Sequence, residues 1–275
     1  MTGNGRRVVR LSWPVILGAL MLAVAACGAV EGGGTPSSTP TPGPSERFQG
    51  VESLDSYRYT LAIRAAGSIL DQSEAPAGLD LENETLTVDI EGYWTSPGNE
   101  YQSANIRFGV LAVRQDSITM DGRLWTSVEG GPWAERESLT GPEEFLGQDI
   151  PLSPNSILGN SGDEMLERLT ADLNGRPHDA QVLNGRQSIH WSLGQDWFDT
   201  FAADFAEILA GVSRDRGMDL TIDLWADVET GVGSKLEVRG TFPGDAEPSI
   251  LMKMELFDIN SPEIKVEQPA GAIDR

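Results

Sequence analysis

The chain has 275 residues, of which 42 are acidic and 20 are basic, so its formal net charge at pH 7 is −22. A surface this acidic repels the phosphates of nucleic acids, which excludes a nucleic-acid-binding protein. The single cysteine excludes disulfides within the chain, and the length is sufficient for one large core or two small ones.

The N-terminal segment resembles the signal of bacterial lipoproteins. Three arginines in residues 6–10 precede an apolar run, Leu11 to Val24, that is too short for a stable membrane span, and small residues then lead into Cys27. In that class a diacylglyceryl group is attached to the cysteine and the preceding peptide bond is cut. The resemblance implies a signal over residues 1–26 and a lipid anchor that holds the protein on the extracytoplasmic face of the cell membrane. The alternative is an ordinary secretory or uncleaved segment with an incidental cysteine.

Residues 27–46 have a different composition, rich in Gly, Pro, Ser and Thr. Such a segment cannot bury enough apolar surface to fold, and its prolines favour an extended chain. We therefore expect a spacer between the anchor and one folded domain over residues 47–275.

Alternating apolar and polar residues predict strands through most of that domain. In residues 57–63 and 86–90 every second side chain is apolar, the period of a sheet with one buried face. Asp121-Gly122 and Asn184-Gly185 each separate two such runs, which predicts hairpins with tight turns. Further strands are expected at residues 220–224, 236–238 and 250–256. The short connections indicate an antiparallel sheet.

Two predicted helices interrupt the strands. The first begins at a capping box, Ser161 to Glu164, and ends at Asn174-Gly175. The second runs from about Asp196 to Val212, and its apolar residues, three phenylalanines among them, recur at helical spacing. This large apolar face either packs on the sheet as core or forms the lid or wall of a cavity for a lipophilic ligand.

The order of these elements resembles the LppX/LprAFG lipoproteins. The segments that carry the resemblance are DGRLWTSVEGGPW at 121–133, VLNGRQSIHW at 182–191, LTIDLWADVETGVGSKLEVRG at 220–240 and LFDINSPEIKVEQP at 256–269. The resemblance implies an α+β fold like that of the LolA/LolB carriers. In that fold a half-open, strongly curved antiparallel barrel is closed by a helical lid, and its hydrophobic interior holds acyl chains.

The expected ligand is therefore a lipid or another amphiphile, which the protein binds or shuttles. Each buried methylene contributes about 0.8 kcal/mol, so long chains bind tightly with little polar recognition. The residues expected to line the cavity are the inward strand positions and the stripe of the second helix: Leu61, Ile63, Val88, Ile90, Met120, Trp191, Phe198, Phe201, Phe205, Ile208, Ile222, Leu224, Met252 and Met254. Ordinary core packing of these side chains is the alternative, for the flexible methionines in particular.

No motif of a known enzyme class is present: there is no Gly-x-Ser-x-Gly elbow, no phosphate-binding loop and no His-Glu-x-x-His. His178 and His190 are expected to be structural or exposed. Asp219, Asp223 and Asp227 recur four apart, which on a strand is about 13 Å, too far to share a metal ion. We expect these aspartates on a solvated face.

The sequence thus predicts a monomeric, non-enzymatic protein without a cofactor or a metal. Two other functions stay open at this point. The same fold could serve as an envelope sensor or accessory domain that binds another protein, or as a scaffold whose interior is packed solid.

Overall fold

The computed structural model describes residues 48–67, 84–136, 163–197 and 217–270. The strands are β1 (Ser56–Ala66), β2 (Thr85–Thr95), β3 (Asn99–Phe108), β4 (Leu111–Met120), β5 (Arg123–Val128), β6 (Ala134–Arg136), β7 (Asp179–Leu183), β8 (Arg186–Leu193), β9 (Asp219–Asp227), β10 (Gly233–Thr241) and β11 (Ile250–Phe257). A short 3-10 helix, η1 (Val51–Ser53), and a helix, α4 (Asp163–Asn174), are the named helices of the described ranges.

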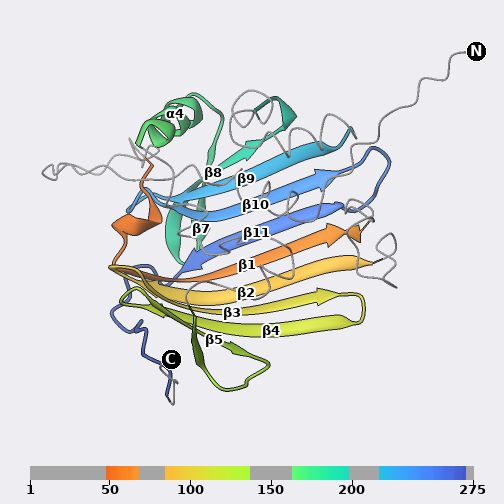
Figure 1. The fold of residues 1–275 in the computed structure, drawn as a ribbon. Helices are drawn as coiled ribbons and strands as arrows, with labels where there is room; N and C mark the ends of the chain where they lie inside the picture. Colours follow the sequence, from red (N-terminus) through yellow and green to blue (C-terminus); the bar gives the residue numbers. More distant parts are fainter. Residues whose placement is uncertain (1–47, 68–83, 137–162, 198–216, 271–275) are drawn as a thin grey trace, which may run out of the picture.

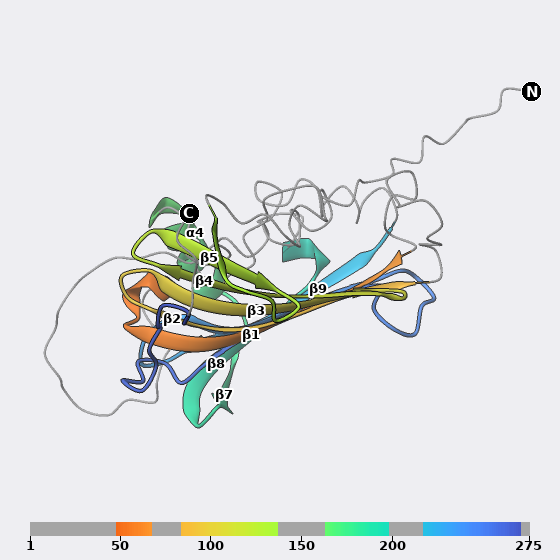
Figure 2. The same ribbon diagram turned by 60° about the horizontal axis from the view of Figure 1, so that its bottom comes forward.

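All eleven strands belong to one antiparallel sheet in the order β6-β5-β4-β3-β2-β1-β11-β10-β9-β8-β7. The first and last strands, β1 and β11, pair at the middle of the sheet, and the other strands extend in chain order to either side (Figure 1). Figure 2 shows that the sheet curves, with α4 on one side of it and the β7–β8 hairpin projecting on the other.

One face of the sheet is apolar because the strands keep their period of two. In β1 the odd residues from Tyr57 to Ala65 are buried, whereas Arg58, Thr60 and Arg64 are exposed. We call the face that carries Leu61 the inner face and the face that carries Arg58 the outer face.

Helix α4 packs on the inner face at β8. The indole Nε1 of Trp191 donates a hydrogen bond of 3.0 Å to the carbonyl oxygen of Leu173 at the end of the helix. Phe48 lies with its ring 5.5 Å from that of Trp191, and its backbone N–H donates to Thr170 Oγ1 at 3.1 Å. The beginning of the described chain is therefore tied to both the helix and the sheet.

Several predictions of local structure are confirmed. The two hairpins exist, and their turn residues have the positive φ of a type I′ turn: 52° and 74° at Asp121-Gly122, and 51° and 77° at Asn184-Gly185. The first predicted helix is α4, which ends before Gly175 as expected. Of the second predicted helix, only Asp196 and Trp197 lie in the described ranges, and they are helical.

The prediction of an α+β half-open barrel closed by a helical lid is wrong. Apart from α4 and η1, the elements named in the described ranges are strands, and those strands form one open sheet. Its edges, β6 and β7, have three and five residues and do not pair with each other. Alternation along a strand is the same in an open sheet and in a barrel, so the pattern that predicted strands could not distinguish the two.

Candidate functional site

Nine of the predicted cavity residues lie together on the inner face, in two adjacent rows that cross the sheet from β8 to β3. In each row, residues on neighbouring strands are directly paired. The first row consists of Trp191, Leu224, Leu236, Met254, Leu61, Ile90 and Ala104. The second row consists of Leu193, Ile222, Val238, Met252, Ile63, Val88 and Ile106. All fourteen side chains are buried, and we call them the apolar rows.

The other predicted site residues do not join the apolar rows. Met120 pairs with Arg123 at the end of β4 and belongs to the outer face, because its neighbour Thr119 is the inner-face residue. The remaining five lie outside the described residues: Cys27, Phe198, Phe201, Phe205 and Ile208.

Toward β5, the inner face becomes polar where the first row continues, whereas the second row continues from Ile106 to Val113. Gln115 follows Ala104 in the first row, and next to it Gln102, Ser117 and Thr126 pair across β3, β4 and β5. All four are buried, and we call them the polar end. Ser117 Oγ lies 3.4 Å from Gln102 Oε1, whereas Gln115 Oε1 has no hydrogen-bond partner within the described chain.

A buried tyrosine lies beside the polar end. The hydroxyl of Tyr59 donates a hydrogen bond of 2.6 Å to Glu100 Oε1. Burial, and after it the negative charge of Glu100, raises the pKa of the Tyr59 hydroxyl well above its ordinary value. Tyr59 therefore stays protonated and acts as a donor at the border between the apolar rows and the polar end.

The polar end was not predicted from the sequence. Three of its four residues come from β3 and β4, where polar side chains point to both faces, so no alternation marks a buried side. The turn at Asp121-Gly122 could have predicted part of it. A tight turn there pairs β4 with β5 and places Ser117 opposite Thr126 on one face of the sheet.

The outer face carries a network of charged side chains around His190. Its Nδ1 lies 3.0 Å from Asp179 Oδ1, its Nε2 lies 3.1 Å from Asp223 Oδ1, and its ring stacks on Trp225 at 4.4 Å. Arg239 Nη1 then bonds the other oxygen of Asp223 at 3.0 Å. Both ring nitrogens of His190 and both carboxylate oxygens of Asp223 therefore have partners on the outer face.

The expectation that the three aspartates of β9 are solvated is wrong for two of them. Asp219 is exposed, but Asp223 and Asp227 are buried. Each has an arginine from a neighbouring strand, Arg239 from β10 and Arg186 from β8, and these partners compensate the burial of charge.

Two further observations concern metals and membranes. Within the described ranges, no group of three or more His, Cys, Asp or Glu side chains is arranged to hold a metal ion. Neither helix of those ranges has the length and hydropathy needed to cross a bilayer.

No protein-family model matches the sequence, and no curated protein is significantly similar to it.

Proposed function

We propose that this protein is a membrane-anchored lipoprotein that binds or shuttles a lipid or another amphiphile on the inner face of its sheet. The observation that carries the proposal is the pair of apolar rows, which run unbroken across seven strands. The anchor is Cys27, on the resemblance of the N-terminal segment to a lipoprotein signal.

The length of the rows is suited to acyl chains. Seven strands have six intervals of about 4.8 Å, which gives a row of about 29 Å. The hydrocarbon core of a bilayer is about 30 Å thick, so an acyl chain from one leaflet covers about half that distance. A row is therefore longer than one such chain, and each methylene that the chain buries against it would contribute about 0.8 kcal/mol.

The polar end supports an amphiphile rather than a hydrocarbon. A molecule whose chain follows the apolar rows places its head group against Gln102, Gln115 and Ser117. The unpartnered Oε1 of Gln115 is an acceptor, so the head group that fits it carries a hydroxyl or an amide N–H. With Glu100 beside this position and a net charge of −22, an anionic head group is disfavoured.

The test uses the protein purified with its anchor from a bacterial host. Native mass spectrometry asks whether a lipid copurifies, and titration with a fluorescent monoacylglycerol measures the affinity. Ala104→Trp fills space within the first apolar row, and Ala62→Trp adds the same bulk to the outer face of β1. We expect Ala104→Trp to weaken probe binding at least tenfold, and Ala62→Trp to bind like the wild type.

A different result would contradict lipid binding on the inner face. If the wild type binds no lipid and Ala104→Trp lowers the free energy of unfolding by about 1–3 kcal/mol, the inner face is a close-packed core. The scaffold or the protein-binding accessory domain then replaces the lipid carrier.

A further inference from the structure

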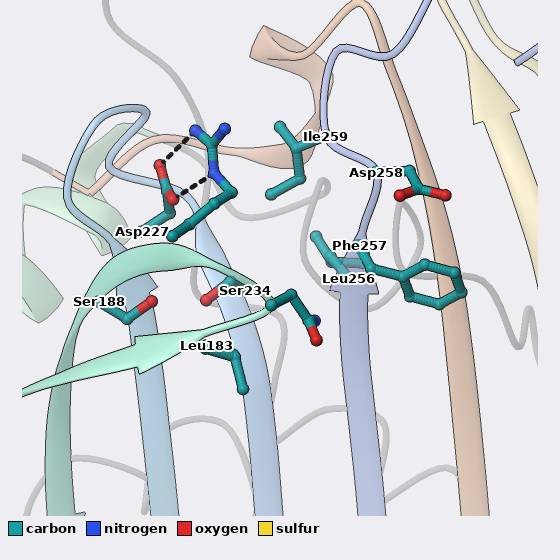
Figure 3. Close-up of a pocket in the computed structure, with 10 residues that line it drawn as sticks. Leu183, Ser188, Asp227, Ser234, Leu256, Phe257, Asp258 and Ile259 are labelled. Carbon is teal, nitrogen blue, oxygen red and sulfur yellow. Dashed lines mark hydrogen bonds and ion pairs between the residues drawn. The ribbon is translucent and has the colours of Figure 1, made fainter. Parts of the chain in front are cut away.

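A second site lies apart from the apolar rows, under the tip of the β7–β8 hairpin. The tip bends toward the outer face, where Asn184 Nδ2 donates a hydrogen bond of 2.8 Å to Glu255 of β11. Between the tip and the ends of β9, β10 and β11 is an open pocket of about 250 Å³ (Figure 3). We call it the hairpin pocket, and its polar lining residues include Arg186, Ser188, Asp227, Ser234 and Asp258.

The charged groups of the hairpin pocket are already paired with one another. Arg186 donates to both carboxylate oxygens of Asp227, from Nε at 2.6 Å and from Nη2 at 3.0 Å, and Nη2 also reaches Glu229 at 3.0 Å. Thr230 adds two hydrogen bonds to Asp227 Oδ1, from its backbone N–H at 2.8 Å and from its hydroxyl at 2.9 Å. The positive charge of the guanidinium is therefore already balanced by carboxylates of the protein.

The two serine hydroxyls of the pocket, unlike its charged groups, have few hydrogen-bond partners. Ser188 is 1% exposed, and its Oγ has no hydrogen-bond partner within the described ranges. Ser234 is also buried, and its Oγ makes one long hydrogen bond, 3.4 Å, to the backbone carbonyl of Trp225. Figure 3 shows both hydroxyl groups turned toward the same space. A buried hydroxyl without a partner carries an energetic cost that a ligand or water removes.

From this arrangement we propose that the hairpin pocket binds a small uncharged polyol, such as a monosaccharide or a cyclitol. The two serines supply a free donor and several free acceptor lone pairs, which complement the hydroxyl groups of such a ligand. Leu183, Leu256 and Ile259 supply the apolar wall that its carbon skeleton needs. The site is independent of lipid binding on the inner face.

The charge of the lining disfavours anionic ligands, and the volume of the pocket suits a small ligand. The lining contains two carboxylates, Asp227 and Asp258, against one guanidinium that is already paired, so a phosphate or carboxylate ligand is repelled. The pocket volume of about 250 Å³ is enough for a six-membered ring with its hydroxyl groups.

The test is ligand-observed saturation-transfer NMR on the full chain in deuterated detergent, with myo-inositol, glucose and inorganic phosphate as probes. We expect binding of at least one polyol in the millimolar range and none of phosphate. Ser188→Ala removes the unpartnered hydroxyl and should weaken polyol binding at least fivefold. Ser192→Ala, an exposed serine farther along β8, is the matched control and should bind like the wild type.

Folding is checked separately, because a variant that unfolds would also lose binding. Ser188→Ala breaks no hydrogen bond within the described chain, so its melting temperature should match the wild type. If it falls, Leu183→Trp, which fills the pocket from its apolar wall, replaces it as the test. Three results would overturn the proposal: no saturation transfer to either polyol, equal transfer in the wild type and a folded pocket variant, or binding of phosphate in preference to the polyols.

Discussion

At the scale of single residues, the buried carboxyl of Asp227 makes the stability of the fold depend on pH. Burial alone raises the pKa of this carboxyl, but the hydrogen bonds from Arg186 and Thr230 outweigh it and leave the pKa below its ordinary value. A carboxyl whose pKa is lower in the folded than in the unfolded chain stabilises the fold above the unfolded pKa, which is about 3.9. That stabilisation is lost as the pH falls through the folded pKa.

Asp227→Asn tests this link. We expect the substitution to lower the free energy of unfolding at pH 7 by about 1–3 kcal/mol, because Arg186 loses the buried one of its two charged partners. The difference from the wild type should shrink below about pH 4, and urea denaturation at pH 7, 5 and 3.5 measures it. Asp219→Asn, at an exposed position on the same strand, is the control. If the difference in the free energy of unfolding between the wild type and Asp227→Asn did not depend on pH, the charge of Asp227 would not be the cause.

The burial of Asp223 and Asp227 could not be predicted from the sequence of β9 alone. The spacing of Asp223 and Asp227 places both on the outer face, and the structure agrees. Whether such a face is solvated depends on its neighbours, and Arg239 and Arg186 reach these carboxylates from other strands. Strand pairing brings these residues together, and no local pattern in β9 records it.

At the scale of elements, the hairpins were predictable because their turn chemistry is local. Asn184 and Gly185 both have positive φ, which the β7–β8 turn requires, and few residue types tolerate that backbone. Strand β3 was missed for the opposite reason. Its inner positions change from polar, at Glu100 and Gln102, to apolar, at Ala104 and Ile106, so no single alternation runs through it.

Gly185→Ala separates backbone strain from packing in this turn. A Cβ at Gly185 meets no atom within 4 Å, so the whole penalty comes from φ of 77°. We expect a loss of about 1–2 kcal/mol in the free energy of unfolding. Gly175→Ala, where φ is outside the left-handed region and the nearest atom is 3.6 Å away, should leave stability nearly unchanged. Similar losses from both substitutions in chemical denaturation would mean that φ is not the cause.

At the scale of the whole molecule, the proposed membrane anchor is tested at the N-terminal segment, which lies outside the described residues. Cys27→Ser should prevent lipid modification and move the protein from the membrane fraction to the soluble fraction of its host. Fractionation and the mass of the N-terminal peptide measure both effects. Removal of the three arginines of residues 6–10 tests the signal separately from the acylated thiol. If the wild-type N-terminus carries no lipid, the lipoprotein prediction is wrong.

The global shape was the least predictable level. Periodicity gave most of the strands and their inner face, and nine predicted cavity residues indeed meet there. Periodicity could not predict whether the sheet closes into a barrel, because that depends on whether the two edge strands pair. Here β6 and β7 are short and far apart in the strand order, and the sheet stays open.

The pairing of β1 with β11 also determines when the molecule can become complete. On either side of this pair, each strand pairs with the next strand along the chain, and the tight hairpins among them form quickly. Strand β1 keeps one unpaired edge until the last strand is available. Joining the two ends of the chain is the slow, high-contact-order step. A chain that emerges N-terminus first therefore assembles its sheet only at the end, and deletion of β11 would leave two separate meanders in place of one sheet.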